Sequence, residues 1–251
     1  MYLRENKFLI SCPARSGSTM LLHLLRSNPQ VMCHGEVFGR DGLGHIAGEY
    51  AAKRRDDDEV GARLQEYRER DPAAFLYDIV FDPQGRRVVG FKFKTDEAFD
   101  PQFADIQEIV RRDRDIRIVQ LRRRNILHQY ISHEVVLHQT GVTWIGNEAD
   151  RPEVEPFEVD VRHAVAYILD VLQREEDVAR VYPEHRRFMV DYEDVVDPSH
   201  PVLEELQLFL RVDPVALSTP TRKILGSNDS LVRNVDDVRQ ALRLMGLEGR
   251  C

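Results

Sequence analysis

Short apolar runs alternate with amphipathic segments along the whole chain. Runs of strand composition, bounded by charged or turn-forming residues, cover residues 7–11, 31–33, 87–93, 117–121 and 187–190. Segments with helical spacing or helix-start signals follow them at residues 18–28, 42–70, 72–81, 101–111, 125–140, 161–181, 198–210 and 236–245. Residues 141–156 form a polar loop, and the stretch 219–234 has an irregular pattern.

This alternation predicts an α/β fold of three layers, in which a mostly parallel central sheet of about five strands is flanked by helices. No internal repeat, low-complexity tract or linker divides the sequence, so residues 1–251 are expected to form a single domain. Ligands of such sheets bind beyond the carboxyl ends of the strands. Candidate site residues are therefore expected where strands end.

Composition and charge narrow the class of protein. Hydrophobic residues make up 42% of the chain and charged residues 31%, which is typical of a globular domain. The 35 basic and 43 acidic residues give a net charge of −8, which disfavours non-specific binding to nucleic acid, so any anion site must be local. No apolar run is long enough to span a bilayer, and the first residues lack a signal-peptide core. The expected location is cytoplasmic.

Cysteines and histidines give no sign of a metal site. The three cysteines, Cys12, Cys33 and Cys251, lack CxxC spacing and are expected to be reduced thiols. The histidines at 128, 133 and 138 recur every five residues and cannot share one face of a helix. No metal is therefore expected.

The segment after the first predicted strand has the composition of a phosphate-binding loop. Residues 11–20 read Ser-Cys-Pro-Ala-Arg-Ser-Gly-Ser-Thr-Met and join this strand to a helix. Backbone amides around Gly17, the helix dipole and the hydroxyls of Ser16, Ser18 and Thr19 would favour an anion. The loop lacks the Gly-Lys-Ser/Thr of a Walker A motif and instead carries Arg15, whose planar fork suits a phosphate group. A purely structural turn, with Ser18 as the helix N-cap, is the alternative.

Residues 13–21 resemble the 5′-phosphosulfate loop of sulfotransferases that use 3′-phosphoadenosine 5′-phosphosulfate (PAPS). The likeness is greatest to the bacterial carbohydrate type, such as the Nod-factor and trehalose sulfotransferases. It implies a P-loop-like fold, PAPS as donor, 3′-phosphoadenosine 5′-phosphate (PAP) as product, and no required metal. It also implies that the loop binds the 5′-phosphate and sulfate, with Arg15 near the bridging oxygen of the leaving phosphate.

Three arginines at residues 122–124 end the fourth predicted strand and precede a helix. The family's 3′-phosphate motif is an arginine at a strand end and a serine eight positions later, and Arg124 and Ser132 match that spacing. Asn125 also resembles the carbohydrate-type motif. Because side chains of a strand alternate in direction, Arg122 and Arg123 are expected to belong to a solvated cluster.

Three further residues are candidates for nucleotide contact by the same resemblance. Tyr192, in the Tyr-Glu pair after the fifth strand, matches an element near the adenine, although an aromatic residue there is often simply core. Residues 221–224 and 231–234 resemble the C-terminal segment that closes over the nucleotide. Lys223 and Arg233 are its candidate phosphate contacts, and the sequence leaves open which of them reaches the nucleotide.

The acceptor side has two candidate general bases. Carbohydrate sulfotransferases of this type carry a glutamate at the place matched by Glu36, whereas a helix N-cap or surface carboxylate is the structural alternative. His34 is the rival base, because estrogen-type sulfotransferases use a histidine for this role at another place in the chain. Lys92 resembles the lysine of the family's third strand, and Lys94 shares its face.

The sequence as a whole indicates an enzyme that transfers a sulfuryl group from PAPS to a hydroxyl of a small acceptor. The expected acceptors are a carbohydrate, a glycolipid or a glycosylated natural product. The alternatives are a P-loop kinase that uses ATP and Mg²⁺, and a PAPS- or PAP-binding module without catalysis, which would have no use for Glu36. Residues 39–85 and 141–160 are expected to line the acceptor site. The identity of the acceptor and the oligomeric state stay open.

Overall fold

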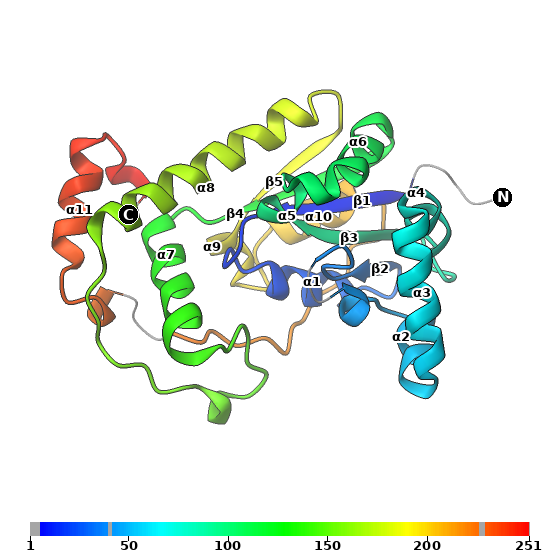
Figure 1. Cartoon of the computed structure of the whole chain (residues 1–251), viewed down its shortest axis with the longest axis horizontal. Coiled ribbons are helices and arrows are strands. Elements are labelled where there is room, and N and C mark those ends of the chain that lie inside the picture. Colours follow the sequence, from blue (N-terminus) through cyan, green and yellow to red (C-terminus); the bar gives the residue numbers. More distant parts are fainter. Residues whose placement is uncertain (1–5, 40–41, 226–228, 251) are drawn as a thin grey trace.

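A computed structural model describes residues 6–39, 42–225 and 229–250 of the chain. Its central element is one sheet with the strand order β2-β3-β1-β4-β5, in which every neighbouring pair is parallel (Figure 1). The strands are β1 (Lys7–Cys12), β2 (Val31–His34), β3 (Val88–Lys94), β4 (Ile116–Arg122) and β5 (Arg187–Asp191). The predicted α/β fold with a parallel sheet of about five strands is confirmed.

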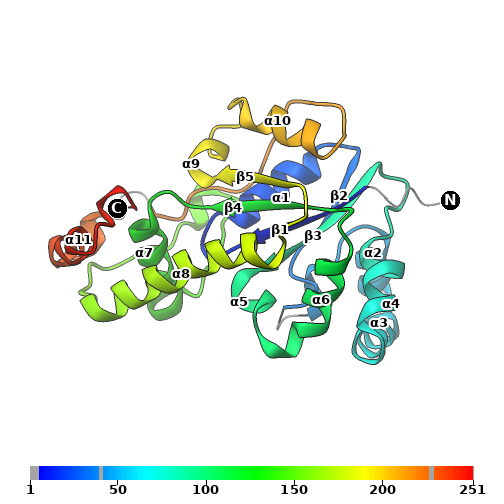
Figure 2. The same ribbon diagram turned by 90° about the horizontal axis from the view of Figure 1, so that it is seen from above.

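Helices cover both faces of the sheet, as Figure 2 shows from above. One face carries α1 (Ser18–Ser27), α9 (Tyr192–Val195) and α10 (Val202–Phe209), and the other carries α5 (Thr95–Ala98), α6 (Ala104–Arg112) and α8 (Val161–Val181). The alternation of side chains along β1 fixes these layers. Phe8 and Ile10 are fully buried among the leucines of α1 and α10, whereas Leu9 packs with the apolar residues of α6 and α8.

Further helices extend the two ends of the sheet (Figure 1). Beyond β2 lie α2 (Glu49–Asp56), α3 (Asp58–Arg70) and α4 (Pro72–Phe75), the last continued by a π-helical turn (Leu76–Val80). At the other end lie α7 (Ile126–Val135), which continues into a π-helical turn (Val136–Thr140), and α11 (Val235–Leu244). Both pack with α8 around the buried Tyr130 and Ile168. Short 3-10 helices cover Gly42–His45, Pro101–Phe103, Glu148–Asp150, Asp229–Leu231 and Glu248–Arg250.

Residues 42–70, predicted to be helical, are mostly so, but they do not form one continuous helix. The chain forms a 3-10 turn and then two helices, α2 and α3, because Gly48 has a φ of +70° and Asp57 is extended. Asp57 ends α2 and caps α3, since its carboxylate accepts the backbone N–H of Glu59 at 2.8 Å. Within the described part of the chain, no helix is long and apolar enough to cross a membrane.

The register of the sheet determines which loops meet at its carboxyl edge. Cys12 at the end of β1 pairs with Lys94 of β3, and Ser11 pairs with Gln120 of β4. The loop that follows β1 therefore lies between the ends of β3 and β4. This edge brings together the segments that the sequence singled out.

Candidate active site

The loop after β1 has an unusual backbone. Arg15 has a φ of +61° and Gly17 a φ of +86°, so two residues close together adopt left-handed conformations at the start of α1. Gly17 is the N-cap of α1 and makes no side-chain cap, so the alternative in which Ser18 caps the helix is wrong. The first amides of a helix have no partner within it, so they are available to an anion at this loop.

The hydroxyls of the loop have different surroundings. Ser16 is fully buried, and its Oγ donates a hydrogen bond to the carbonyl of Pro13 at 2.8 Å, so it shapes the loop from within. Ser18 and Thr19 instead line open space at the helix start. Of the three predicted hydroxyl donors, these two are placed to contact a ligand.

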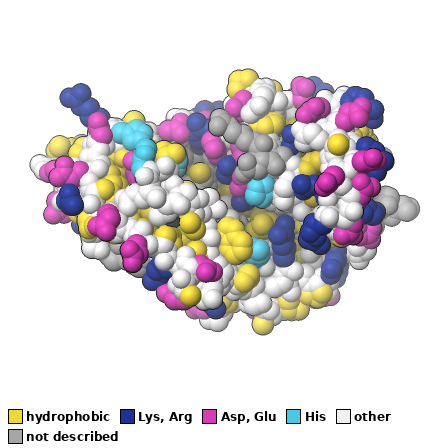
Figure 3. Space-filling view, turned by 60° about the horizontal axis from the view of Figure 1, so that its bottom comes forward, with side chains coloured by type: hydrophobic (Ala, Val, Ile, Leu, Met, Phe, Trp, Pro, Cys, Tyr) yellow, Lys and Arg dark blue, Asp and Glu magenta, His cyan; other side chains and the backbone are white. Residues whose placement is uncertain are grey.

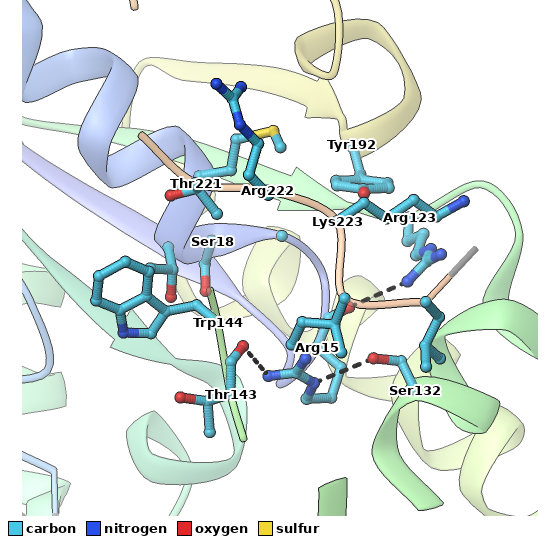
Figure 4. Close-up of a pocket in the computed structure, with 15 residues that line it drawn as sticks. Arg15, Ser18, Arg123, Ser132, Thr143, Trp144, Tyr192, Thr221, Arg222 and Lys223 are labelled. Carbon is cyan, nitrogen blue, oxygen red and sulfur yellow. Dashed lines mark hydrogen bonds between the residues drawn. The ribbon is translucent and has the colours of Figure 1, made fainter. Parts of the chain in front are cut away.

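Tyr192, the first residue of α9, packs directly on the loop. A Cβ built on Gly17 would lie 2.2 Å from Cδ2 of the Tyr192 ring, so only glycine allows this contact. The ring of Tyr192 faces the same cavity as the loop (Figure 4). The structure therefore brings the predicted Tyr-Glu element and the predicted phosphate loop together.

Two arginines converge beside this loop, as Figure 4 shows. Arg15 donates from Nε to the Ser132 hydroxyl at 3.3 Å and from Nη1 to the Thr143 carbonyl at 2.8 Å. The Arg123 guanidinium lies 4.7 Å from the ring centroid of Tyr192 and donates to the carbonyl of Arg15 at 3.5 Å. Arg123 is 7% exposed. No carboxylate in the described ranges is ion-paired with either arginine.

Burial of these two charges is unfavourable without a counter-ion. Burial and then the charge of Arg123 lower the pKa of Arg15, and burial lowers the pKa of Arg123. Both nonetheless stay charged, because the ordinary pKa of arginine is so high. Arg15 is partly buried and Arg123 is buried, and neither is paired with a carboxylate of the described residues. An anionic ligand bound between them would therefore be stabilising.

The cavity at this point, here called the Arg123 cavity, has a volume of about 650 Å³. It is bounded by the loop, by α7, by β4 and β5 at their carboxyl ends, and by residues 143–144 and 221–225. Its lining includes Arg15, Gly17, Ser18, Thr19, Arg123, Ser132, Trp144, Tyr192 and Lys223.

The prediction that Arg123 belongs to a solvated cluster is wrong. Directly after the end of β4, Arg123 is buried and lines the cavity, whereas Arg122 and Arg124 pair with carboxylates outside it. The Arg124 side chain is 50% exposed and binds Asp194 at 2.7 Å and Asp191 at 3.1 Å. The structure thus brings Ser132 together with Arg15 and Arg123, and it leaves Arg124 outside the cavity.

The two C-terminal candidates, Lys223 and Arg233, lie in different surroundings. Lys223 lines the Arg123 cavity beside Thr221. Arg233 is exposed, and its backbone N–H donates to the carbonyl of Phe157 at 2.9 Å, in a bridge that joins two loops. Residues 226–228, within the segment predicted to close over the nucleotide, lie outside the described residues.

A second cavity, here called the Glu36 cavity, has a volume of about 1150 Å³ and adjoins the first. Glu36 contacts Lys92 at 2.6 Å and Lys94 at 3.1 Å, and Lys94 also contacts Glu97 at 2.9 Å. The two cavities share the lining residues Arg15, Ser18, Thr19, Thr143 and Trp144. They therefore meet at the start of α1, with Arg15 at the junction.

The protonation states of the acceptor-side groups follow from these contacts. Burial alone would raise the pKa of Glu36, but Lys92 and Lys94 outweigh it and hold the pKa below its ordinary value. Glu36 is thus ionised at neutral pH. Burial raises the pKa of Glu97 to about 7, partly offset by Lys94.

His34, the other candidate base, lies away from both cavities. It is fully buried at the end of β2, its Nδ1 accepts the backbone N–H of Ala47 at 2.9 Å, and it lines neither cavity. Burial lowers its pKa to about 3, so the imidazole is neutral at any ordinary pH. Glu36 therefore faces open space next to Arg15, and His34 does not.

Trp144 lies in the segment 141–160 that was expected to line the acceptor site, although the sequence did not single it out within that segment. It is 45% exposed, and its ring centroid lies 5.6 Å from that of His23 on α1. Among the residues that the structure describes, no group of three or more His, Cys, Asp or Glu side chains is arranged to hold a metal ion.

Comparison with known proteins places the fold. No protein-family model matches the chain, and no curated protein matches it significantly. The sulfotransferase domain of the olefin synthase of Synechococcus PCC 7002 aligns with 92% of this chain and 82% of its own, with a TM-score of 0.52 and 19% identity. A sulfotransferase from Alicyclobacillus acidocaldarius aligns with 97% of this chain and 92% of its own, with a TM-score of 0.50 and 16% identity. The chain therefore shares the α/β fold of these bacterial sulfotransferases.

Proposed function

We propose that this protein is a PAPS-dependent sulfotransferase that acts on a hydroxyl of a small, sugar-containing acceptor. The observation that carries the proposal is the pair of cavities that meet at the start of α1. One contains two arginines without carboxylate partners, and the other contains a carboxylate held by two lysines. The fold shared with two bacterial sulfotransferases supports the same assignment.

The Arg123 cavity is the proposed donor site. The first amides of α1 with Ser18 and Thr19 would bind the 5′-phosphosulfate, since a helix N-terminus favours a negative group. Arg123 and Ser132 would bind the 3′-phosphate, and Lys223 would add a charge on the opposite wall. Tyr192, whose ring already stacks with the Arg123 guanidinium, offers an aromatic surface to the nucleoside.

The Glu36 cavity is the proposed acceptor site. PAPS supplies the sulfuryl group, and the acceptor oxygen forms a bond to sulfur as the bond from sulfur to the bridging phosphate oxygen breaks. Glu36 takes the acceptor's proton, and the electron pair of the broken bond leaves with PAP. Arg15, at the junction of the cavities, would stabilise the charge that grows on the bridging oxygen, and Lys92 the charge of the sulfuryl oxygens.

A carbohydrate acceptor is favoured by Trp144. Its ring forms part of the wall between the two cavities and is nearly half exposed, although large apolar side chains tend to be buried. An exposed aromatic ring in a cavity that also contains charged and hydroxyl groups is suited to packing against the apolar face of a sugar ring.

Incubation with ³⁵S-labelled PAPS and a panel of sugars, glycolipids and phenols tests the proposal. We expect label to pass to a sugar-containing acceptor in the parent and to be lost in Glu36→Gln, while Glu59→Gln on the surface of α3 transfers normally. Transfer of label from [γ-³²P]ATP with Mg²⁺, and none from PAPS, would overturn the assignment in favour of a kinase. PAP binding without transfer to any acceptor class would favour a non-catalytic binding module.

A further inference from the structure

The Glu36 cavity has more positive charge than its proposed chemistry uses. Four cationic side chains line it, namely Arg15, Arg26, Lys92 and Lys94, and Glu36 is the carboxylate among its lining residues. Figure 3 shows lysine, arginine and histidine side chains gathered around a hollow on this face. The chain as a whole has a net charge of −8, so this concentration of positive charge is local.

Three of these four cations already have partners or roles. Lys92 is paired with Glu36, and Lys94 is paired with both Glu36 and Glu97. Arg15 lies at the junction of the cavities, where the proposed leaving phosphate would be. These three groups are therefore accounted for by the donor and by the proposed base.

Arg26 is the remaining cation. Its Nε donates to the carbonyl of Cys33 at 2.7 Å, which holds the side chain against the end of β2. No carboxylate in the described part of the chain is paired with Arg26, and its guanidinium lines the Glu36 cavity. A fixed guanidinium without a carboxylate is suited to binding a carboxylate or phosphate group through two parallel hydrogen bonds.

Arg26 lies at the end of a row of cavity-lining residues on α1 that begins at Thr19. Thr19, His23 and Arg26 recur on one face of α1, and all three line the Glu36 cavity. At the rise of an α-helix, Thr19 and Arg26 are roughly 10 Å apart along the axis. Between them, His23 lies against Trp144. Burial and then Arg26 lower the pKa of His23, so it adds no charge at neutral pH.

We infer that the acceptor is an acidic saccharide whose carboxylate or phosphate group binds Arg26 while a hydroxyl of a neighbouring sugar lies beside Glu36. This inference rests on the proposed function, because it treats the Glu36 cavity as the acceptor site. Disaccharides are chosen as probes because Thr19 and Arg26 are separated by roughly 10 Å along α1. Trp144 would pack against the ring between the two ends.

Binding of matched disaccharides tests this inference. The probes are cellobiose, cellobiose with C6 of the non-reducing glucose oxidised to a carboxylate, and the corresponding 6-phosphate, titrated by calorimetry with and without PAP. We expect at least one acidic probe to bind about ten to a hundredfold more tightly than cellobiose, as hydrogen bonds to charged groups do. Arg26→Gln should abolish this preference without changing the affinity for cellobiose. Arg26→Lys should keep part of it.

The control is Arg180→Gln, which removes an exposed arginine of α8 paired with Asp177 and far from the lining residues of both cavities. Arg180→Gln should keep the full preference for acidic probes, as should the parent protein. Equal affinities for all three probes, absence of binding, or a preference that survives in Arg26→Gln would overturn the inference. The melting temperature of each variant shows whether it is folded.

Failure of the inference is distinguishable from failure of the proposed function. PAP affinity and ³⁵S transfer are measured on the same protein samples. A preference for acidic probes that depends on Arg26, without PAP binding, would refute the sulfotransferase assignment and leave the anion site. PAP binding and transfer to neutral sugars, without a preference for acidic probes, would refute the anion site at Arg26 and leave the sulfotransferase assignment.

Discussion

At the scale of single residues, the two arginines that follow β4 differ in whether they can reach the proposed donor site. Arg123 is buried beside Arg15 and Tyr192, whereas Arg124 is half exposed and held by the carboxylates that follow β5. A motif with fixed spacing from Ser132 selects Arg124, but in the structure it is the neighbouring Arg123 that lines the cavity.

We therefore predict that Arg123→Met weakens PAP binding about ten to a hundredfold, because it removes a charged partner of a phosphate. Calorimetric titration with PAP measures the change. The free energy of unfolding of the ligand-free variant should not fall, since replacing a buried charge without a carboxylate by an apolar side chain is often neutral or stabilising.

Arg124→Met is the matched control for this prediction. It should bind PAP as the parent does, because the Arg124 guanidinium is satisfied by Asp191 and Asp194 outside the cavity. Strong loss of PAP affinity in Arg124→Met and little in Arg123→Met would show that the spacing of the motif, and not the position in the structure, identifies the 3′-phosphate contact.

The two candidate bases also differ in position, because Glu36 lines a cavity and His34 does not. Glu36→Gln should lower kcat by about 10²–10⁴ at saturating acceptor, as loss of a general base does, and leave PAP binding unchanged. His34→Gln should keep the kcat of the folded protein and lower its melting temperature, because it disturbs a fully buried side chain. Steady-state rates and thermal denaturation of both variants measure this. Normal turnover in Glu36→Gln with a collapse in His34→Gln would give the role to the histidine.

The pH dependence of the reaction should follow the charge around Glu36. The base must be ionised, and its pKa is held below the ordinary value of a carboxyl group, so kcat/KM should fall only at acidic pH. Lys94→Met removes one of the two ammonium groups that lower this pKa. The acid limb of kcat/KM should then move up by about one pH unit.

Lys53→Met, on the exposed surface of α2, is the control for Lys94→Met and should leave the pH profile of kcat/KM unchanged. An acid limb that did not move in Lys94→Met would contradict the assignment of this limb to Glu36.

At the scale of elements, the turn from β1 to α1 depends on contact with α9. Gly17→Ala must place a Cβ at positive φ and within 2.2 Å of the Tyr192 ring. Gly141 has a similar φ of +64°, but a Cβ there would meet nothing within 4 Å. Gly141→Ala should therefore cost only the backbone strain, roughly 1–2 kcal/mol, and Gly17→Ala should cost clearly more.

Urea denaturation measures both free energies of unfolding. A double-mutant cycle isolates the contact, because Gly17→Ala should be less costly in a Tyr192→Ala background. Equal costs of the two glycine substitutions would contradict close packing of α9 on the loop after β1.

The elements themselves differed in how far the sequence predicted them. All five strands were predicted to within a few residues, because buried parallel strands are continuous apolar runs between charged or turn residues. Residues 42–70 were predicted to be helical without their division into separate helices, because charged residues continue through the break at Asp57 without a change of pattern. The four-residue helix α5, which contains Glu97, was missed because one turn has no periodicity to detect.

The candidate site residues were named mainly from resemblance to sulfotransferase motifs. Arg15, Glu36, Lys92 and Tyr192 lie at or near strand ends, which agrees with a ligand site at one edge of a parallel sheet. Thr143 and Trp144 were predicted only as part of the segment 141–160, since the path of that loop depends on tertiary contacts such as the bond from Arg15 to the Thr143 carbonyl.

At the scale of the whole molecule, the strand order explains why two cavities share one wall. The central strand β1 ends between β3, which supplies Lys92 and Lys94, and β4, which supplies the arginines. The loop after β1 therefore faces the proposed acceptor on one side and the proposed nucleotide on the other. Segments more than a hundred residues apart in sequence meet at this loop, as the bond from Arg15 to Ser132 shows.

The comparison of PAP with ATP and Mg²⁺ as stabilising ligands tests the central claim most directly. A ligand that binds the folded state raises the melting temperature by mass action. Because the Arg123 cavity offers cations for a second phosphate beside the loop, PAP should raise the melting temperature at concentrations where ATP with Mg²⁺ has little effect. Equal or stronger stabilisation by ATP with Mg²⁺ would contradict the account and indicate a kinase-like protein.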